Sequence, residues 1–211
     1  MSEFIEKHGA SLVEKIFEHL SISLTALLIG SLIAIPVGII VSRNKKISQF
    51  TIGVTSILQT IPSLALLAIV VPILGVGRKP AIFALVIYSL LPILRNTVLG
   101  MESVDENTMD AAKGMGMTPI QQIFKVQLPL AMPVVFAGVR LSGTYVLAWA
   151  TLAAYIGAGG MGDFIFAGLN NYNITLIVVG TLSITLLTLL VDALFEVVEK
   201  KLVPDKGGLS S

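Results

Sequence analysis

Long apolar runs alternate with short polar segments along most of the chain. Five runs are long enough to cross a hydrocarbon core, which takes about 20 helical residues: Leu20–Val41, Phe50–Leu74, Ala81–Leu99, Pro133–Ile156 and Ile174–Val198. The sequence shows none of the short alternating strands of a barrel, so helices must satisfy the backbone within lipid. The pattern predicts an all-α membrane protein with about five core transmembrane helices.

Both ends of the chain differ from the apolar runs. In residues 1–19, apolar positions recur at helical spacing opposite Glu and Lys, which predicts an amphipathic helix on the membrane surface. A helix that leads straight into the first span is the alternative. These charged residues do not resemble a cleavable signal peptide, which needs a basic start and an apolar core. Residues 20–203 are expected to form the transmembrane domain, and residues 204–211 a cytoplasmic tail.

The distribution of basic residues indicates the orientation of the spans. Short loops rich in Lys and Arg lie in the cytoplasm, and the basic residues that follow the first and fifth runs are Arg43, Lys45, Lys46, Lys200, Lys201 and Lys206. Five spans then place the N-terminus outside and the polar segment of about residues 100–132 in the cytoplasm. Arg78 and Lys79, between the second and third runs, count against this orientation.

Composition excludes several kinds of site. The chain of 211 residues is 55% hydrophobic and 13% charged, whereas a soluble domain has about 25% charged residues. Cysteine is absent, which excludes disulfides and thiolate metal sites. His8 and His19 lack carboxylates at a convincing ligand spacing and are interpreted as ordinary surface histidines. A net charge of +1 argues against a nucleic-acid surface.

Nucleotide-binding motifs do not account for the glycines. Gly157–Gly162 matches G-x-G-x-x-G, but it follows a membrane span where a dinucleotide site needs a β-strand, and the sequence has no phosphate-binding P-loop motif. These glycines are expected to form a tight extracellular turn or to let helices approach closely. We therefore expect this chain to bind no cofactor by itself.

Two charged residues lie within predicted spans. Asp192 is expensive to place in lipid and is expected to face the bundle interior or a partner subunit. Arg140 is expected to extend its side chain to the cytoplasmic interface.

The polar segment carries the local signals of two short helices. Ser103 followed by Glu106 predicts a capping box, and Gly114 and Gly116 predict the end of that helix. The sequence Thr118-Pro-Ile-Gln predicts a second capped helix. Its apolar stripe is expected to contain Ile120, Ile123 and Phe124, and Leu128-Pro129 is expected to end it. A helix, a sharp bend and a second helix form a docking element, in which Ala111 and Ala112 would permit close approach of a partner.

The spacing of this segment resembles that of a known family. Asp110-Ala-Ala112, three residues, Gly116, nine residues and Val126-Gln-Leu-Pro129 resemble the EAA loop of bacterial ABC importer permeases, E-A-A-x3-G-x9-I-x-L-P. Asp stands where that loop has Glu, and Val where it has Ile. Gln59–Leu64, Tyr88–Thr97 and Ala150–Gly162 are similar to permeases of osmoprotectant importers, which carry glycine betaine, carnitine, choline and related quaternary ammonium compounds.

The resemblance covers about Leu20 to Val203 and implies a type I importer transmembrane domain in the bacterial plasma membrane. It implies a non-catalytic subunit that pairs with a second permease, two ATPase subunits that bind ATP and Mg, and a separate extracellular substrate-binding protein. A different second permease is favoured, and an identical copy remains the alternative. The residues that would contact the ATPase are Asp110, Ala111, Ala112, Gly114, Gly116, Thr118, Leu128 and Pro129.

Aromatic residues are the candidates for the translocation path, because aromatic faces attract quaternary ammonium groups. The candidates are Tyr88, Tyr145, Trp149 and Tyr155, for which packing or an interfacial position is the alternative explanation. Three other functions compete with this hypothesis: an ATP-independent secondary transporter or channel, a membrane scaffold, and an importer permease for another small solute.

Overall fold

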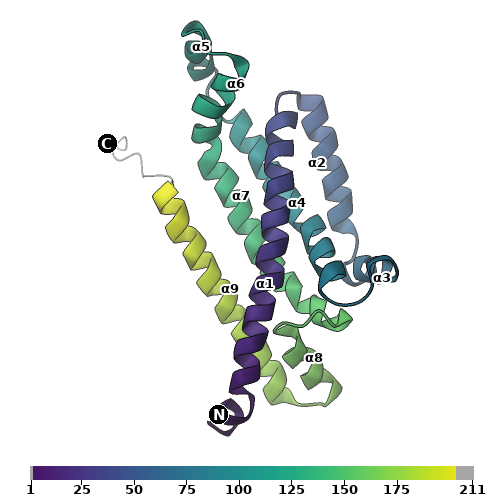
Figure 1. The fold of residues 1–211 in the computed structure, drawn as a ribbon. Coiled ribbons are helices and arrows are strands. Elements are labelled where there is room, and N and C mark those ends of the chain that lie inside the picture. The colour runs from purple at the N-terminus through teal and green to yellow at the C-terminus, as the bar shows by residue number, and fades with distance from the viewer. Residues whose placement is uncertain (1, 203–211) are drawn as a thin grey trace.

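The computed structural model describes residues 2–202, and every element in that range is helical (Figure 1). The prediction of a tail at residues 204–211 lies outside the described residues. Four helices are long and apolar enough to cross a membrane, and the number rises to five if one bent pair of helices counts as a span. The prediction of an all-α membrane protein with about five spans is confirmed.

The first helix is longer than the first apolar run. Helix α1 extends without interruption over Ser2–Val41, which is 40 residues. The amphipathic start of the chain is therefore continuous with the first span, as in the alternative interpretation.

The second predicted span is a bent pair of helices. Helix α2 (Lys45–Thr60) and helix α3 (Ser63–Leu74) meet at an angle of 90°. Pro62 lies at this break, and Ile61 before it has an extended backbone with φ −63° and ψ 125°. A residue that precedes proline disfavours the helical conformation, so α2 ends there. The run Phe50–Leu74, predicted as the second span, therefore contains a sharp bend.

The third and fourth spans are connected by the polar segment. Helix α4 (Arg78–Glu102) leads to α5 (Glu106–Gly114) and α6 (Pro119–Gln122), and a π-helical turn, η1 (Ile123–Gln127), then leads directly into α7 (Leu128–Trp149). The prediction that Leu128-Pro129 ends the second short helix is therefore wrong. Pro129 lies in the first turn of α7, so it does not end the helical segment.

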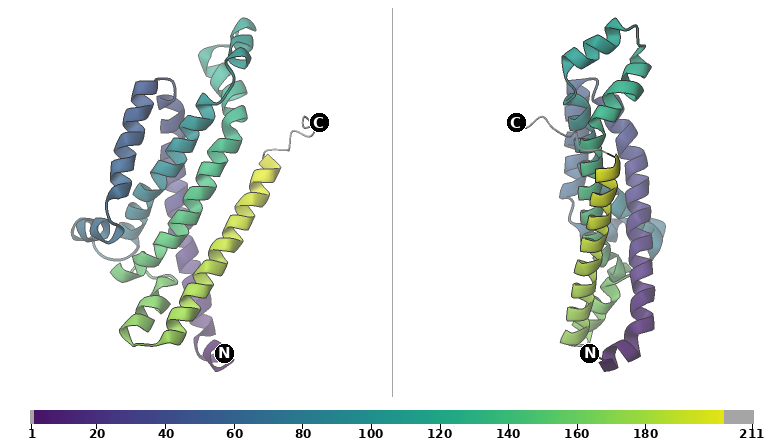
Figure 2. Two further views of the ribbon diagram at one scale, coloured as in Figure 1. Left: turned by 180° about the vertical axis from the view of Figure 1, so that it is seen from behind. Right: turned by 90° about the vertical axis from the view of Figure 1, so that its left-hand side faces the viewer.

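The last part of the chain completes the bundle. Helix α7 tightens into the 3-10 helix η2 (Ala150–Ile156), and α8 (Gly162–Asn170) and α9 (Ile174–Leu202) follow. Figure 2 shows α5 and α6 protruding at one end of the bundle, while the N-terminus and the α8–α9 connection lie at the other. We call these the α5 end and the N-terminal end.

Small residues let the central helices α1, α4 and α7 pack closely. A Cβ atom at Gly38 of α1 would come within 2.7 Å of the Thr97 side chain on α4, and one at Gly138 of α7 within 3.0 Å of the Pro92 carbonyl oxygen. Such contacts are usual between membrane helices, where small residues permit close backbone approach. Helix α9 packs on α7 and α8, and most of its residues remain outside the core.

Candidate functional site

Helix α5 is held in place at its start by Asp105. The Asp105 carboxylate accepts a hydrogen bond from the Thr108 backbone N–H at 3.2 Å, which satisfies one of the free donors of the first turn. Ser103 instead follows the end of α4, and its hydroxyl donates to the Gly100 carbonyl at 2.9 Å. The predicted Ser103–Glu106 capping box is therefore wrong, because Asp105 is a competing cap two residues later.

The end of α5 is a glycine bend. Gly116 has φ +77°, a conformation that favours glycine. The Gly116 N–H donates to the Lys113 carbonyl at 2.9 Å, and the Met117 N–H donates to the Ala112 carbonyl at 3.2 Å. This pair of bonds is a Schellman motif, which satisfies the last carbonyls of the helix. Gly114 is the last residue of α5, so both glycines lie where the sequence predicted the helix to end.

Helix α6 begins with the predicted capping box. The Thr118 hydroxyl accepts from the Gln121 backbone N–H at 3.4 Å, and the Gln121 side chain accepts from the Thr118 N–H at 2.9 Å. Pro119 occupies the first turn. The Gln127 amide then donates to the Met101 carbonyl at 2.9 Å, which fastens η1 to the end of α4. The segment is thus connected to the bundle through defined contacts.

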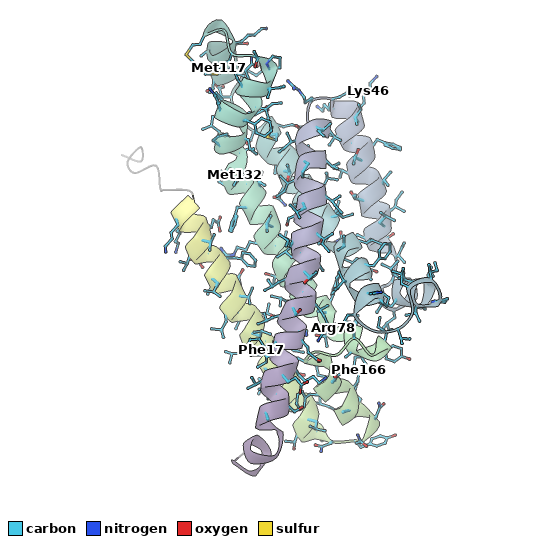
Figure 3. All side chains as sticks on the ribbon, viewed as in Figure 1. Phe17, Lys46, Arg78, Met117, Met132 and Phe166 are labelled. Carbon is cyan, nitrogen blue, oxygen red and sulfur yellow. The ribbon has the colours of Figure 1, made fainter. Side chains whose placement is uncertain are left out.

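The polar segment exposes large apolar side chains. Met115, Ile120 and Phe124 are 70%, 68% and 61% exposed. They belong to the protruding α5 end, where Figure 3 labels Met117. Ile123, from the same predicted stripe, is buried against α4 and α7. Exposed apolar side chains in a segment that stands clear of the bundle indicate a surface for a partner protein.

The eight predicted contact residues do not all face outward. Asp110, Ala111, Gly114, Gly116, Thr118 and Pro129 are exposed, while Leu128 is half-buried. Ala112 is 1% exposed. The expectation that Ala112 lets a partner approach is therefore wrong, because its methyl group packs inside the segment.

Three of the four predicted path aromatics lie together. The Trp149 ring contacts Tyr88 edge-on at 4.3 Å between centroids and stacks with Tyr145 at 6.3 Å. The Tyr88 hydroxyl donates to the Ile61 carbonyl at 2.6 Å, at the break between α2 and α3. Tyr155 is apart from this group, since it packs on Phe166 of α8.

The cavity beside these rings is small. It has a volume of about 10 Å³ and is lined by Ser63, Leu67, Ala81, Ala84, Leu85, Tyr88, Trp149, Leu152 and Ala153. A cavity of this size holds no more than one water molecule. In this conformation a single chain therefore does not enclose a solute beside Tyr88 and Trp149.

An ion-pair cluster joins α7 to α9. Arg140 donates two hydrogen bonds of 2.7 Å to the two carboxylate oxygens of Asp192, and further contacts reach Glu199 at 3.1 Å and Glu196 at 3.5 Å. Asp192 thus faces Arg140 within the same chain. Arg140 pairs with α9 and does not extend alone to the interface as predicted. The sequence carries a signal for this pair, because Arg140 and Asp192 are opposite charges within apolar runs.

A second charged cluster fastens the N-terminal end. Glu18 of α1 accepts from the Gly160 backbone N–H at 2.9 Å and pairs with Lys15 at 2.9 Å and Arg78 at 3.3 Å, while Lys15 also contacts Asp163 at 2.7 Å. A Cβ atom at Gly159 would collide with the Glu18 carboxylate. The Gly157–Gly162 turn therefore allows close approach of α1, which is one of the two roles predicted for these glycines.

His19 is the clearest departure from its predicted environment. It is 1% exposed, and its Nε2–H donates to the Leu147 carbonyl of α7 at 2.9 Å, so the prediction of a surface histidine is wrong. His8 lies outside the residues whose side chains are described. Within the described part of the chain, no three His, Asp or Glu residues lie close enough to hold a metal ion.

These features define a multi-pass membrane protein with a protruding helical element for a partner. The chain belongs to the family of binding-protein-dependent transport system inner membrane components, whose model matches residues 26–204. The motif spacing of the polar segment had indicated this family.

Relatives and a solved structure agree with this assignment. The chain is 51% identical to the carnitine transport permease protein OpuCB of Listeria monocytogenes, over 95% of this chain and 92% of that protein. It is 47% identical to the glycine betaine/carnitine/choline transport system permease protein OpuCB of Bacillus subtilis, over 97% and 94%. It shares its fold with the inward-facing MetNI methionine ABC transporter at a TM-score of 0.85 and 22% identity, covering 94% of this chain and 99% of that chain.

Proposed function

We propose that the chain is the permease subunit of an ATP-driven, binding-protein-dependent importer for quaternary ammonium osmoprotectants such as carnitine, choline and glycine betaine. Its membership of the family and the carriers named among its relatives at 47–51% identity support this solute class. The chain supplies half of the translocation path, and a second permease, for which a different chain is favoured over an identical copy, supplies the other half.

The observation that carries the coupling role is the construction of the α5 end. Helix α5 is capped by Asp105 and ends in the Gly116 bend, and the segment exposes Met115, Ile120 and Phe124. A helix fixed at both ends transmits displacement without unwinding. ATPase subunits that hold ATP and Mg would seat this element, and their closure would move α4 and α7, which it connects.

The proposed orientation places the α5 end in the cytoplasm and the N-terminal end outside. Arg78 and Lys79 count against it as basic residues on the outer side, and Arg78 pairs there with Glu18 at 3.3 Å. Lys46, one of the basic residues that follow α1, lies at the α5 end, as Figure 3 shows.

Solute would pass along the aromatic group of Tyr88, Tyr145 and Trp149. Tyr145 is 42% exposed on the surface of α7, so its ring is available to a second permease or to a solute between the two chains. Tyr155 lies apart from that group and would line only the outer entrance of the path.

Reconstitution with the ATPases and a binding protein tests the proposal. Gly116→Val should lower carnitine uptake and binding-protein-stimulated ATP hydrolysis at least tenfold, because a β-branched residue opposes φ +77° at the bend. Gly53→Val, in α2 and outside the coupling segment, is the matched control: nothing lies within 4 Å of either added Cβ, and Gly53 has no positive φ. It should behave like the wild type.

Three results would contradict the proposal. Uptake by this chain without ATPases or ATP would indicate a secondary transporter or channel. ATP-dependent uptake of methionine but not of carnitine, choline or glycine betaine would assign another solute. Equal coupling in the Gly116→Val and Gly53→Val complexes would remove α5 from the coupling pathway.

A further inference from the structure

The helix that connects the α5 end to the fourth span contains a widened turn. Pro119–Ile156 forms one continuous helical element, so the π-helical turn η1 lies inside a helix and does not separate two of them. The Leu128 N–H donates to the Ile123 carbonyl, five residues back, where an α-helix bonds four residues back. Turns of this kind are rare and occur frequently at functional sites.

Pro129 accounts for the position of this turn. Inside a continuous helix, proline leaves one backbone hydrogen bond unformed, and its ring clashes with the carbonyl four residues back, which here belongs to Lys125. A wider turn directly before Pro129 relieves that clash. Pro133 removes a second donor one turn further along α7. The helix therefore has fewer backbone hydrogen bonds in this stretch than a regular α-helix has.

The widened turn lies at the boundary between the packed and the protruding parts of the helix. On the bundle side, the Gln127 amide donates to the Met101 carbonyl at 2.9 Å, and Ile123 is buried against α4 and α7. On the other side, α6 has no buried residue, and its Ile120 is 68% exposed. Figure 2 shows α5 and α6 standing clear of the bundle. The bundle therefore holds η1 in place but does not hold the segment beyond it.

We infer that η1 is a hinge about which the α5–α6 segment turns relative to α7, an inference that rests on the proposed function. Helices bend at prolines and at π-helical turns, and this helix has both together. The other connection of the segment, to α4, is fixed by hydrogen bonds from the Ser103 hydroxyl to Gly100 and from the Thr108 N–H to Asp105. A displacement of α5 by the ATPase would therefore be absorbed at η1 and would reach α4 more directly than α7.

The variant Pro129→Ala tests the hinge, and Pro36→Ala is its matched control. Alanine restores the backbone donor and has the highest helix propensity, so it should stiffen the turn. Carnitine uptake by the reconstituted complex should fall about fivefold or more, as for loss of a conformational step. The ATPase subunits should remain bound, and the melting temperature should not fall. Pro36 also lies inside a helix, α1, and is exposed, so Pro36→Ala should leave uptake close to the wild type.

A distance measurement reports the movement itself. Because the chain has no cysteine, Asn107→Cys in α5 and Leu141→Cys in α7 provide two unique, exposed sites for spin labels. With cysteine-free partner subunits, the distance between the labels should differ between the nucleotide-free complex and the complex trapped with ATP. This difference should be largely lost in the Pro129→Ala complex and retained in the Pro36→Ala complex.

The outcomes separate the hinge from a contact role. The same label distance in both nucleotide states of a wild-type complex that takes up carnitine would overturn the inference. A full distance change with normal uptake in the Pro129→Ala complex would also overturn it. Loss of the ATPase subunits from that complex would overturn it in favour of Pro129 as a contact residue. If the wild-type complex shows no ATP-dependent uptake, the proposed function itself fails, which is distinguishable from failure at η1.

Discussion

Arg140 connects α7 to α9 through three carboxylates, and replacing it with methionine should loosen α9 from the bundle. Both bonds to Asp192 are 2.7 Å long, and the two side chains are 26% and 35% exposed. A fully exposed pair contributes about 0–1 kcal/mol, whereas removing one partner of a buried pair costs about 3–5 kcal/mol. At this intermediate exposure we expect Arg140→Met to cost about 2–3 kcal/mol.

The cost should depend on which partner is removed. Arg140→Met leaves Asp192, Glu196 and Glu199 close together without their shared cation. Asp192→Asn leaves Arg140 with Glu199 at 3.1 Å and Glu196 at 3.5 Å, so it should cost only about 1 kcal/mol. The asymmetry follows directly from the number of contacts on each side.

Thermal unfolding of the purified permease measures the difference. For a chain of this size about 1 kcal/mol shifts the melting temperature by about 2–4 °C, so Arg140→Met should lower it by about 5–10 °C and Asp192→Asn by about 2–4 °C. Arg43→Met, at an exposed position near the start of α2, is the matched control and should change it little. Equal losses in the Arg140 and Asp192 variants, or no loss in either, would refute the reasoning.

Two further substitutions test packing and the bend between α2 and α3. Gly162→Ala should lower the melting temperature by about 2–8 °C, because the added Cβ would overlap the Thr151 carbonyl oxygen. The control Gly53→Ala should raise the melting temperature slightly, since no atom lies within 4 Å of its added Cβ. Equal effects of the two substitutions would contradict the close packing at Gly162. Tyr88→Phe removes the 2.6 Å hydrogen bond to the Ile61 carbonyl and should lower the melting temperature by about 2–4 °C. The apparent KM for transport should not change. A changed KM would instead assign the Tyr88 hydroxyl to the translocation path.

The sequence alone was sufficient for features that depend on neighbouring residues. Apolar runs of about 20 residues predicted the membrane helices, because each such helix satisfies its own backbone in lipid. The Thr118 capping box and the Gly116 bend were predicted in place, since both are formed by residues within six positions of each other. The spacing of the EAA-like segment indicated the family for the same reason: it is a linear pattern.

Contacts between distant residues were decided by the tertiary structure. The burial of His19 depends on the Leu147 carbonyl, 128 positions away, and the pairing of Arg140 with Asp192 joins residues 52 positions apart. Ala112 was predicted on an outward face because a helical period does not say which face a neighbouring helix covers. Local patterns therefore determined which segments are helices and placed the Gly116 bend and the Thr118 cap, while the packing of α1, α4, α7 and α9 determined which polar groups meet inside the bundle.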